Sequence, residues 1–142
     1  MCILITAFEP FGGAETNITQ SILSLLPDSF ADWAIEKVCL PVSFKRAPIV
    51  LREAIATYSP DLVIMLGQCP AGENIRLERF AINMMDSSKA DNDGYIPNEE
   101  TIYRYPIVVP KPTENLKKEK QESLTIRQAI VDIFLIYFLY LY

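Results

Sequence analysis

Residues 61–67 read Asp-Leu-Val-Ile-Met-Leu-Gly, an apolar run that continues without interruption to a glycine. Such a run is typical of a parallel strand in the middle of a sheet, because other layers cover both faces of that strand. Ser59-Pro60 ends the segment in front of it and gives the strand a clear start. We therefore expect residues 61–67 to form a central strand of an α/β sheet.

Further strand candidates lie on both sides of this run. Residues 2–8 are apolar and lead into a glycine loop, Glu-Pro-Phe-Gly-Gly, at residues 9–13. Residues 35–42 carry apolar side chains at alternate positions. Residues 77–85 are a weaker candidate, and Asp-Asn-Asp-Gly at residues 91–94 is a strong turn signal. The first two candidates are separated from each other and from residues 61–67 by segments long enough for helices.

Two helices are expected in those intervals. Asn17, with Gln20 three residues later, predicts a capping pattern in front of a helix over residues 18–26. Residues 43–58 have apolar side chains at helical spacing, and Pro48 is tolerated because it lies in the first turns. The order β-α-β-α-β predicts an open, mostly parallel sheet with helices on both faces, which is a three-layer α/β/α domain.

The composition is that of an ordinary globular protein. Of the 142 residues, 50% are hydrophobic and 22% are charged, and a net charge of −5 gives no reason to expect nucleic acid or an anionic membrane as a partner. Cys2, Cys39 and Cys69 are widely spaced, which argues against a disulfide framework or a metal site and fits a reducing compartment. Because the N-terminal residues lack the pattern of a signal peptide, we expect a cytoplasmic protein.

The sequence changes character after about Thr101. Residues 115–122 are rich in charge, and residues 133–142 are an uncharged run of apolar and aromatic residues. That run is shorter than the roughly 20 residues that a membrane-spanning helix needs. It has two interpretations: a buried strand, or a sequence read out of frame and not selected to fold.

Ligands of an open parallel sheet bind outside the carboxyl ends of its strands. After the first strand, Phe8 and Phe11 lie beside two glycines, although a tight turn with core aromatics would have the same sequence. After the strand at residues 61–67 come Gln68 and Glu78, where an ion pair of Glu78 with Arg79 is the alternative to a functional role. These residues are the candidates for a binding site.

A set of motifs along the chain occurs together in one known family. The motifs are Ile-Thr-Ala-Phe-Glu-Pro-Phe-Gly-Gly at residues 5–13, Leu-Pro-Val at 40–42, Leu-Gly-Gln at 66–68, Leu-Glu-Arg-Phe-Ala-Ile-Asn at 77–83 and the turn at 91–94. In this order and spacing they resemble pyroglutamyl-peptidase I. The resemblance implies a cytoplasmic cysteine exopeptidase that needs no cofactor or metal and removes N-terminal pyroglutamate from peptides. Since members of that family often form tetramers, it also implies a homo-oligomer.

The resemblance also assigns roles to individual residues. Glu78 matches the family's catalytic carboxylate, which orients a histidine. Phe8 and Phe11 match aromatic residues that line the pocket for the pyroglutamyl ring, and Gln68 matches a residue that contacts the lactam of that ring. Asp91 matches an acidic residue near the site, although a turn aspartate would occupy the same position.

The chain departs from the family in its catalytic machinery. It has no histidine, no Gly- and Thr-rich segment with a nucleophilic cysteine after the turn, and Ser88 where the family commonly has an arginine. Cys69 lies near the expected site, but no histidine is present to activate its thiol. We expect an inactive chain in which residues 1–101 are the N-terminal part of an α/β peptidase domain. Residues 102–142 would be a divergent tail, out of frame or not stably folded. A non-catalytic pyroglutamate-binding protein and a pseudogene-like fragment are the alternatives.

Overall fold

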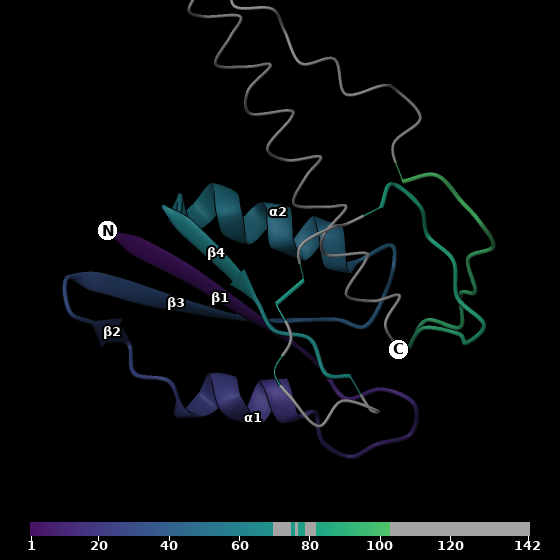
Figure 1. Ribbon diagram of the computed structural model, residues 1–142, viewed down its shortest axis with the longest axis horizontal. Helices are drawn as coiled ribbons and strands as arrows, with labels where there is room; N and C mark the ends of the chain where they lie inside the picture. The colour runs from purple at the N-terminus through teal and green to yellow at the C-terminus, as the bar shows by residue number, and fades with distance from the viewer. Residues whose placement is uncertain (70–74, 76, 79–81, 103–142) are drawn as a thin grey trace, which may run out of the picture.

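The structure is a computed structural model that describes residues 1–69, 75, 77–78 and 82–102. Along the chain its elements are β1 (Cys2–Phe8), α1 (Ile18–Leu25), β2 (Ser29–Phe30), β3 (Trp33–Leu40), α2 (Ala47–Tyr58) and β4 (Leu62–Met65), as Figure 1 shows. The strands form one sheet in the order β2-β3-β1-β4. β1 is parallel to β3 and β4, whereas β2 is antiparallel to β3. The predicted open, mostly parallel sheet is confirmed.

The two helices cover opposite faces of the sheet (Figure 1). Successive side chains of a strand point to opposite faces, and β1 is mostly apolar on both, with the buried Thr6 as the polar exception. Leu4 and Phe8 of β1 pack in a buried cluster with Leu51 of α2. Ile5 of β1 packs in a second cluster with Leu23 of α1. The three layers α/β/α that the sequence predicts are therefore present, and they are built around β1.

The apolar run at residues 61–67 has a different position from the one we expect. Among the described strands β4 pairs with β1 and lies at the edge of the sheet, with Leu62 45% and Ile64 38% exposed. Val63 and Met65, on the other face, pack against the cluster beneath α2. The prediction of a central strand covered on both faces is thus wrong for the described residues. An apolar run does not specify strand order, which the crossover connections set.

The first helix begins where the sequence predicts, but only one of the two expected capping contacts, that of Asn17, is present. Asn17 Oδ1 accepts a hydrogen bond from the N–H of Thr19 at 2.9 Å and so caps α1. Gln20 does not complete a capping box, because its side-chain amide points to Cys39 Sγ at 3.6 Å. Cys39 is exposed on β3.

The second helix begins later than expected. α2 starts at Ala47, and residues 43–46 form a turn in front of it. Ser43 closes that turn, since its Oγ accepts the N–H of Arg46 at 3.0 Å and its carbonyl accepts the N–H of Ala47 at 3.0 Å. Pro48 lies in the first helical turn, where it interrupts no hydrogen bond.

Two further predictions concern the region after β4. The turn at residues 91–94 is confirmed: the Gly94 N–H donates to the Asp91 carbonyl at 3.0 Å, and Gly94 has a φ of 81°. The strand predicted over residues 77–85 is described only in part, and there Met85 makes an isolated antiparallel bridge with Glu100. The predictions for residues 103–142 lie outside the described residues. Within the described part, no helix has the length and apolar character of a membrane span.

Candidate functional site

The loop after β1 lies at the carboxyl edge of the sheet. β1 and β3 end together, because Phe8 is in register with Leu40, and the Glu9 N–H donates to the Leu40 carbonyl at 3.0 Å. The loop then turns through Gly12 and Gly13, whose φ values of 61° and 79° are in the left-handed region that favours glycine. This is the edge at which ligands bind in open parallel sheets.

The two aromatic candidates lie at the base of this loop. Phe8 is fully buried, at 0% exposure, inside the cluster beneath α2. Phe11 is half-buried and packs against the same cluster. Phe8 therefore has the position of a core aromatic in this structure, whereas Phe11 keeps part of its surface accessible at the loop.

Gln68 lies at the start of α1. Its Oε1 accepts a hydrogen bond from the N–H of Ile18 at 2.9 Å. That N–H belongs to the first residue of α1 and has no partner inside the helix. Gln68 thus connects the chain after β4 to the far end of the loop that begins at Glu9.

Glu78 is half-buried. Its neighbour Arg79 lies outside the described residues, and so does the alternative of an ion pair between them. Cys69 directly follows Gln68 and is also half-buried. Among the residues that the structure describes, no cluster of three or more His, Cys, Asp or Glu side chains is arranged to hold a metal ion.

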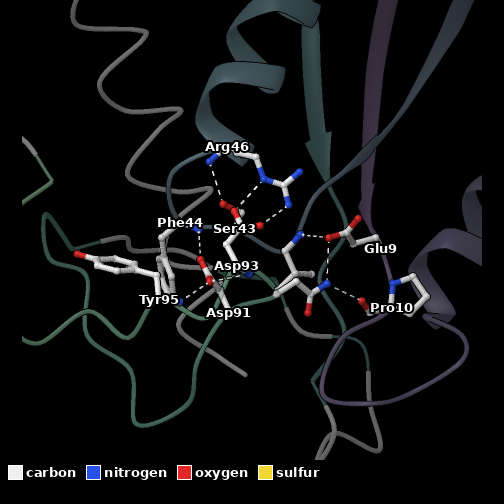
Figure 2. A network of polar contacts seen from close by, with 10 residues as sticks. Glu9, Pro10, Ser43, Phe44, Arg46, Asp91, Asp93 and Tyr95 are labelled. Atoms are coloured by element: carbon white, nitrogen blue, oxygen red, sulfur yellow. Dashed lines mark hydrogen bonds and ion pairs between the residues drawn. The ribbon is translucent and has the colours of Figure 1, made fainter.

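Asp91 is a structural centre of the turn (Figure 2). It is 9% exposed, and its carboxylate accepts three backbone N–H groups: Phe44 at 2.9 Å, Tyr95 at 2.9 Å and Asp93 at 3.0 Å. These bonds hold the turn at residues 91–94 against the segment in front of α2. The geometry is that of the turn aspartate that the sequence left open as an alternative.

A second group of contacts, which the sequence does not predict, joins the turn to the loop after β1. Glu9 Oε1 accepts the N–H of Val42 at 3.0 Å and the side-chain amide of Asn92 at 2.9 Å. The same amide donates to the Pro10 carbonyl at 2.9 Å, and Figure 2 shows Glu9 and Pro10 side by side. The one signal in the sequence was a charged residue between two aromatics in an otherwise apolar segment.

Arg46 and Asp93 add an ion pair on the outside of the turn. The guanidinium donates from Nε at 2.8 Å and from Nη2 at 2.7 Å to the two carboxylate oxygens (Figure 2). The hydrogen bond from Arg46 lowers the pKa of Asp93 from 3.8 to about 2. The side chain of Asp93 is 38% exposed, so water screens this pair and its contribution to stability is small.

Comparison with known proteins identifies the family. The model of the pyroglutamyl peptidase family matches residues 1–108. The chain belongs to the pyroglutamyl peptidase family. The resemblance stated from the motifs is confirmed.

Relatives of known sequence and structure agree with this pyroglutamyl peptidase assignment. The chain is 46% identical to the pyrrolidone-carboxylate peptidase of Thermococcus onnurineus over 72% of its own length and 52% of that protein. It is similar to the crystal structure of the pyrrolidone carboxyl peptidase of Fervidobacterium islandicum, with a TM-score of 0.71 and 37% identity over 75% of this chain and 52% of that one. For the pyroglutamyl peptidase I of Bacillus amyloliquefaciens the TM-score is 0.70, with 33% identity over 74% and 50% of the two chains. This chain spans about half the length of the relatives that it matches.

Proposed function

We propose that this chain carries the pyroglutamate-recognising part of a pyroglutamyl peptidase, a cysteine exopeptidase that removes N-terminal pyroglutamate from peptides. The observation that supports it best is the glycine loop at the carboxyl ends of β1 and β3, with Gln68 beside the first turn of α1. Its ligand would be a peptide with an N-terminal pyroglutamate, in the cytoplasm. Homo-oligomeric assembly is part of the same proposal.

The residues of the loop suit a small, flat, neutral lactam. An aromatic face such as that of Phe11 supplies apolar burial, and a side-chain amide such as that of Gln68 can recognise the N–H and C=O of the ring. Phe8, which is buried beneath the loop, would support the pocket from inside the core. Asp91 would act through the turn that it organises, without contact to the ligand.

In a catalytically competent member of this family, Glu78 would be the carboxylate that orients a histidine. A cysteine thiolate would attack the scissile amide, the histidine would protonate the leaving amine, and water would release pyroglutamate from the acyl-enzyme. The 142 residues contain no histidine, so we propose that they bind pyroglutamate without hydrolysing its amide. Residues 1–101 would be the N-terminal part of the peptidase domain and residues 102–142 a divergent tail.

Binding and turnover can be measured separately on the purified 142-residue chain. We expect calorimetry to detect pyroglutamate but not proline, which lacks the lactam carbonyl, and a pyroglutamyl reporter amide to remain uncleaved. Turnover that a thiol reagent abolishes would contradict the claim of inactivity. A cooperative thermal transition without pyroglutamate binding would contradict the recognition site, and the absence of any transition would favour the pseudogene-like fragment.

A pair of substitutions tests the pocket itself. Phe11→Ala should weaken pyroglutamate binding about tenfold or more, because burial of an aromatic side chain contributes roughly 1.5–3 kcal/mol. Phe30→Ala is the matched control, since Phe30 is 69% exposed on β2, away from the loop. Equal affinities of the two variants for pyroglutamate would contradict the proposal that Phe11 lines the pocket.

A further inference from the structure

Glu9 is fixed at both its backbone and its side chain. Its N–H donates to the Leu40 carbonyl at 3.0 Å, which continues the pairing of β1 with β3. Its Oε1 accepts the Val42 N–H at 3.0 Å and the Asn92 side-chain amide at 2.9 Å. Hydrogen bonds to a carboxylate are stronger than those between neutral groups. Glu9 therefore ties the first residue of the loop to two segments that are distant in sequence.

Asn92 completes this connection from the side of the turn. Its backbone N–H donates to the Val42 carbonyl at 2.9 Å, so the turn is docked on the same segment that Glu9 holds. Its side-chain amide donates both to Glu9 Oε1 and to the Pro10 carbonyl at 2.9 Å. An amide NH₂ has two hydrogens, so one asparagine can serve both acceptors.

The far end of the loop returns to the same residue. Asn17, which is 1% exposed and caps α1, donates from its side-chain amide to the Glu9 carbonyl at 3.1 Å. Between these anchors the loop contains Gly12 and Gly13, which restrict the backbone least. The conformation of the loop between Glu9 and Asn17 thus depends on the contacts made at the two ends of the loop.

We infer that Glu9 and Asn92 are positioning residues, which hold the loop that carries Phe11 in the conformation needed to bind the pyroglutamyl ring. Neither side chain contacts the ligand in this inference. Their effect passes through the Pro10 carbonyl and the Glu9 backbone into the loop. The consequence for ligand binding rests on the proposed function, whereas the effect on the loop does not.

The chemistry of the pair distinguishes conservative from disruptive substitutions. Both hydrogen bonds to Glu9 go to the same oxygen, so Glu9→Gln can retain them through its amide oxygen. Asn92→Asp has no side-chain N–H to donate, and it places a second carboxylate beside Glu9. Glu9→Gln should therefore behave almost like the unaltered chain, and Asn92→Asp should behave like Glu9→Ala.

Amide hydrogen exchange measures the loop without any ligand. The Ala14 N–H donates to the Phe11 carbonyl at 3.1 Å and reports whether the loop is closed. We expect Glu9→Ala and Asn92→Asp to accelerate exchange at Ala14 about tenfold, as the loss of two hydrogen bonds predicts. Exchange in Glu9→Gln should stay within about threefold of the unaltered chain.

Asp93→Asn is the control variant, because it lies on the same turn but loses the ion pair with Arg46 instead of a contact with Glu9. Exchange at Ala14 should not change in this variant. The inference is overturned if Ala14 is unaffected in Glu9→Ala and Asn92→Asp, if Asp93→Asn accelerates it equally, or if Glu9→Gln is as disruptive as Glu9→Ala. Should Glu9→Ala fail to fold, Asn92→Asp decides alone, because Asn92 is exposed.

A ligand measurement separates this inference from the proposed function. If the unaltered chain binds pyroglutamate, Glu9→Ala and Asn92→Asp should weaken the affinity about tenfold or more. Glu9→Gln should retain the affinity of the unaltered chain. Equal affinity in all variants would overturn the positioning role. If the unaltered chain does not bind pyroglutamate, the proposed function fails, and the exchange at Ala14 still decides whether the pair holds the loop.

Discussion

At the scale of single residues, the Arg46–Asp93 ion pair makes stability depend on pH. The hydrogen bond from Arg46 lowers the pKa of Asp93 from 3.8 to about 2. Because the pKa is lower in the folded state, the stabilisation is fully present above about pH 4 and is lost as the pH falls through about 2. Because water screens the pair, urea unfolding of the unaltered chain and of Asp93→Asn should differ by a small amount at neutral pH and converge as the pH approaches 2. A difference that is the same at all pH values would contradict this assignment.

The sequence predicts candidate site residues, but it does not predict the hydrogen bonds that hold the surrounding loop. Phe11, Gln68 and Glu78 could be selected from the sequence because their order matches a known family. The bond between Glu9 and Asn92 could not, since its partners are 83 positions apart and neither belongs to a local pattern. The role of Asp91 stayed open for a related reason, because a turn aspartate and a site carboxylate have the same sequence. In the structure its carboxylate accepts three backbone N–H groups, as a turn aspartate does, and a role near the site stays a prediction.

At the scale of elements, the start of α1 is where the loop and the helix stabilise each other. Asn17 accepts from the Thr19 N–H at 2.9 Å and donates to the Glu9 carbonyl at 3.1 Å. Asn17→Ala removes the cap and leaves that carbonyl without this donor, so unfolding should require about 2 kcal/mol less free energy. Ser24→Ala is the control in the same helix, because Ser24 is exposed and the change should stay within about 0.5 kcal/mol. Urea denaturation measures both, and equal effects would contradict the role of the cap.

Strand and helix positions followed from local signals, but strand order did not. The bounds of β1 and the start of α1 agree with the sequence, because an apolar run and an asparagine cap act on their own neighbours. α2 does not begin at Ser43, as the sequence predicts, but at Ala47. The Ser43 hydroxyl accepts the N–H of Arg46 and so forms a turn in front of the helix. Among the described strands β4 is at the edge although its sequence is that of a central strand, because the connections of the chain determine which strands pair.

At the scale of the whole molecule, the three layers depend on the side chains that β1 presents to α2. Leu51 is 0% exposed and packs in one cluster with Leu4 and Phe8, so the helix and the base of the candidate site share a core. Leu51→Ala leaves a cavity there, and we expect it to reduce the free energy of unfolding by about 2–5 kcal/mol. Leu25→Ala removes the same atoms from a side chain that is 84% exposed, so its effect should stay within about 0.5 kcal/mol. Urea unfolding followed by circular dichroism compares the two. The total free energy of unfolding of a small domain is roughly 5–15 kcal/mol, so a loss of this size should shift the urea midpoint clearly. Equal midpoints for the two variants would mean that the cluster beneath α2 does not hold the layers together.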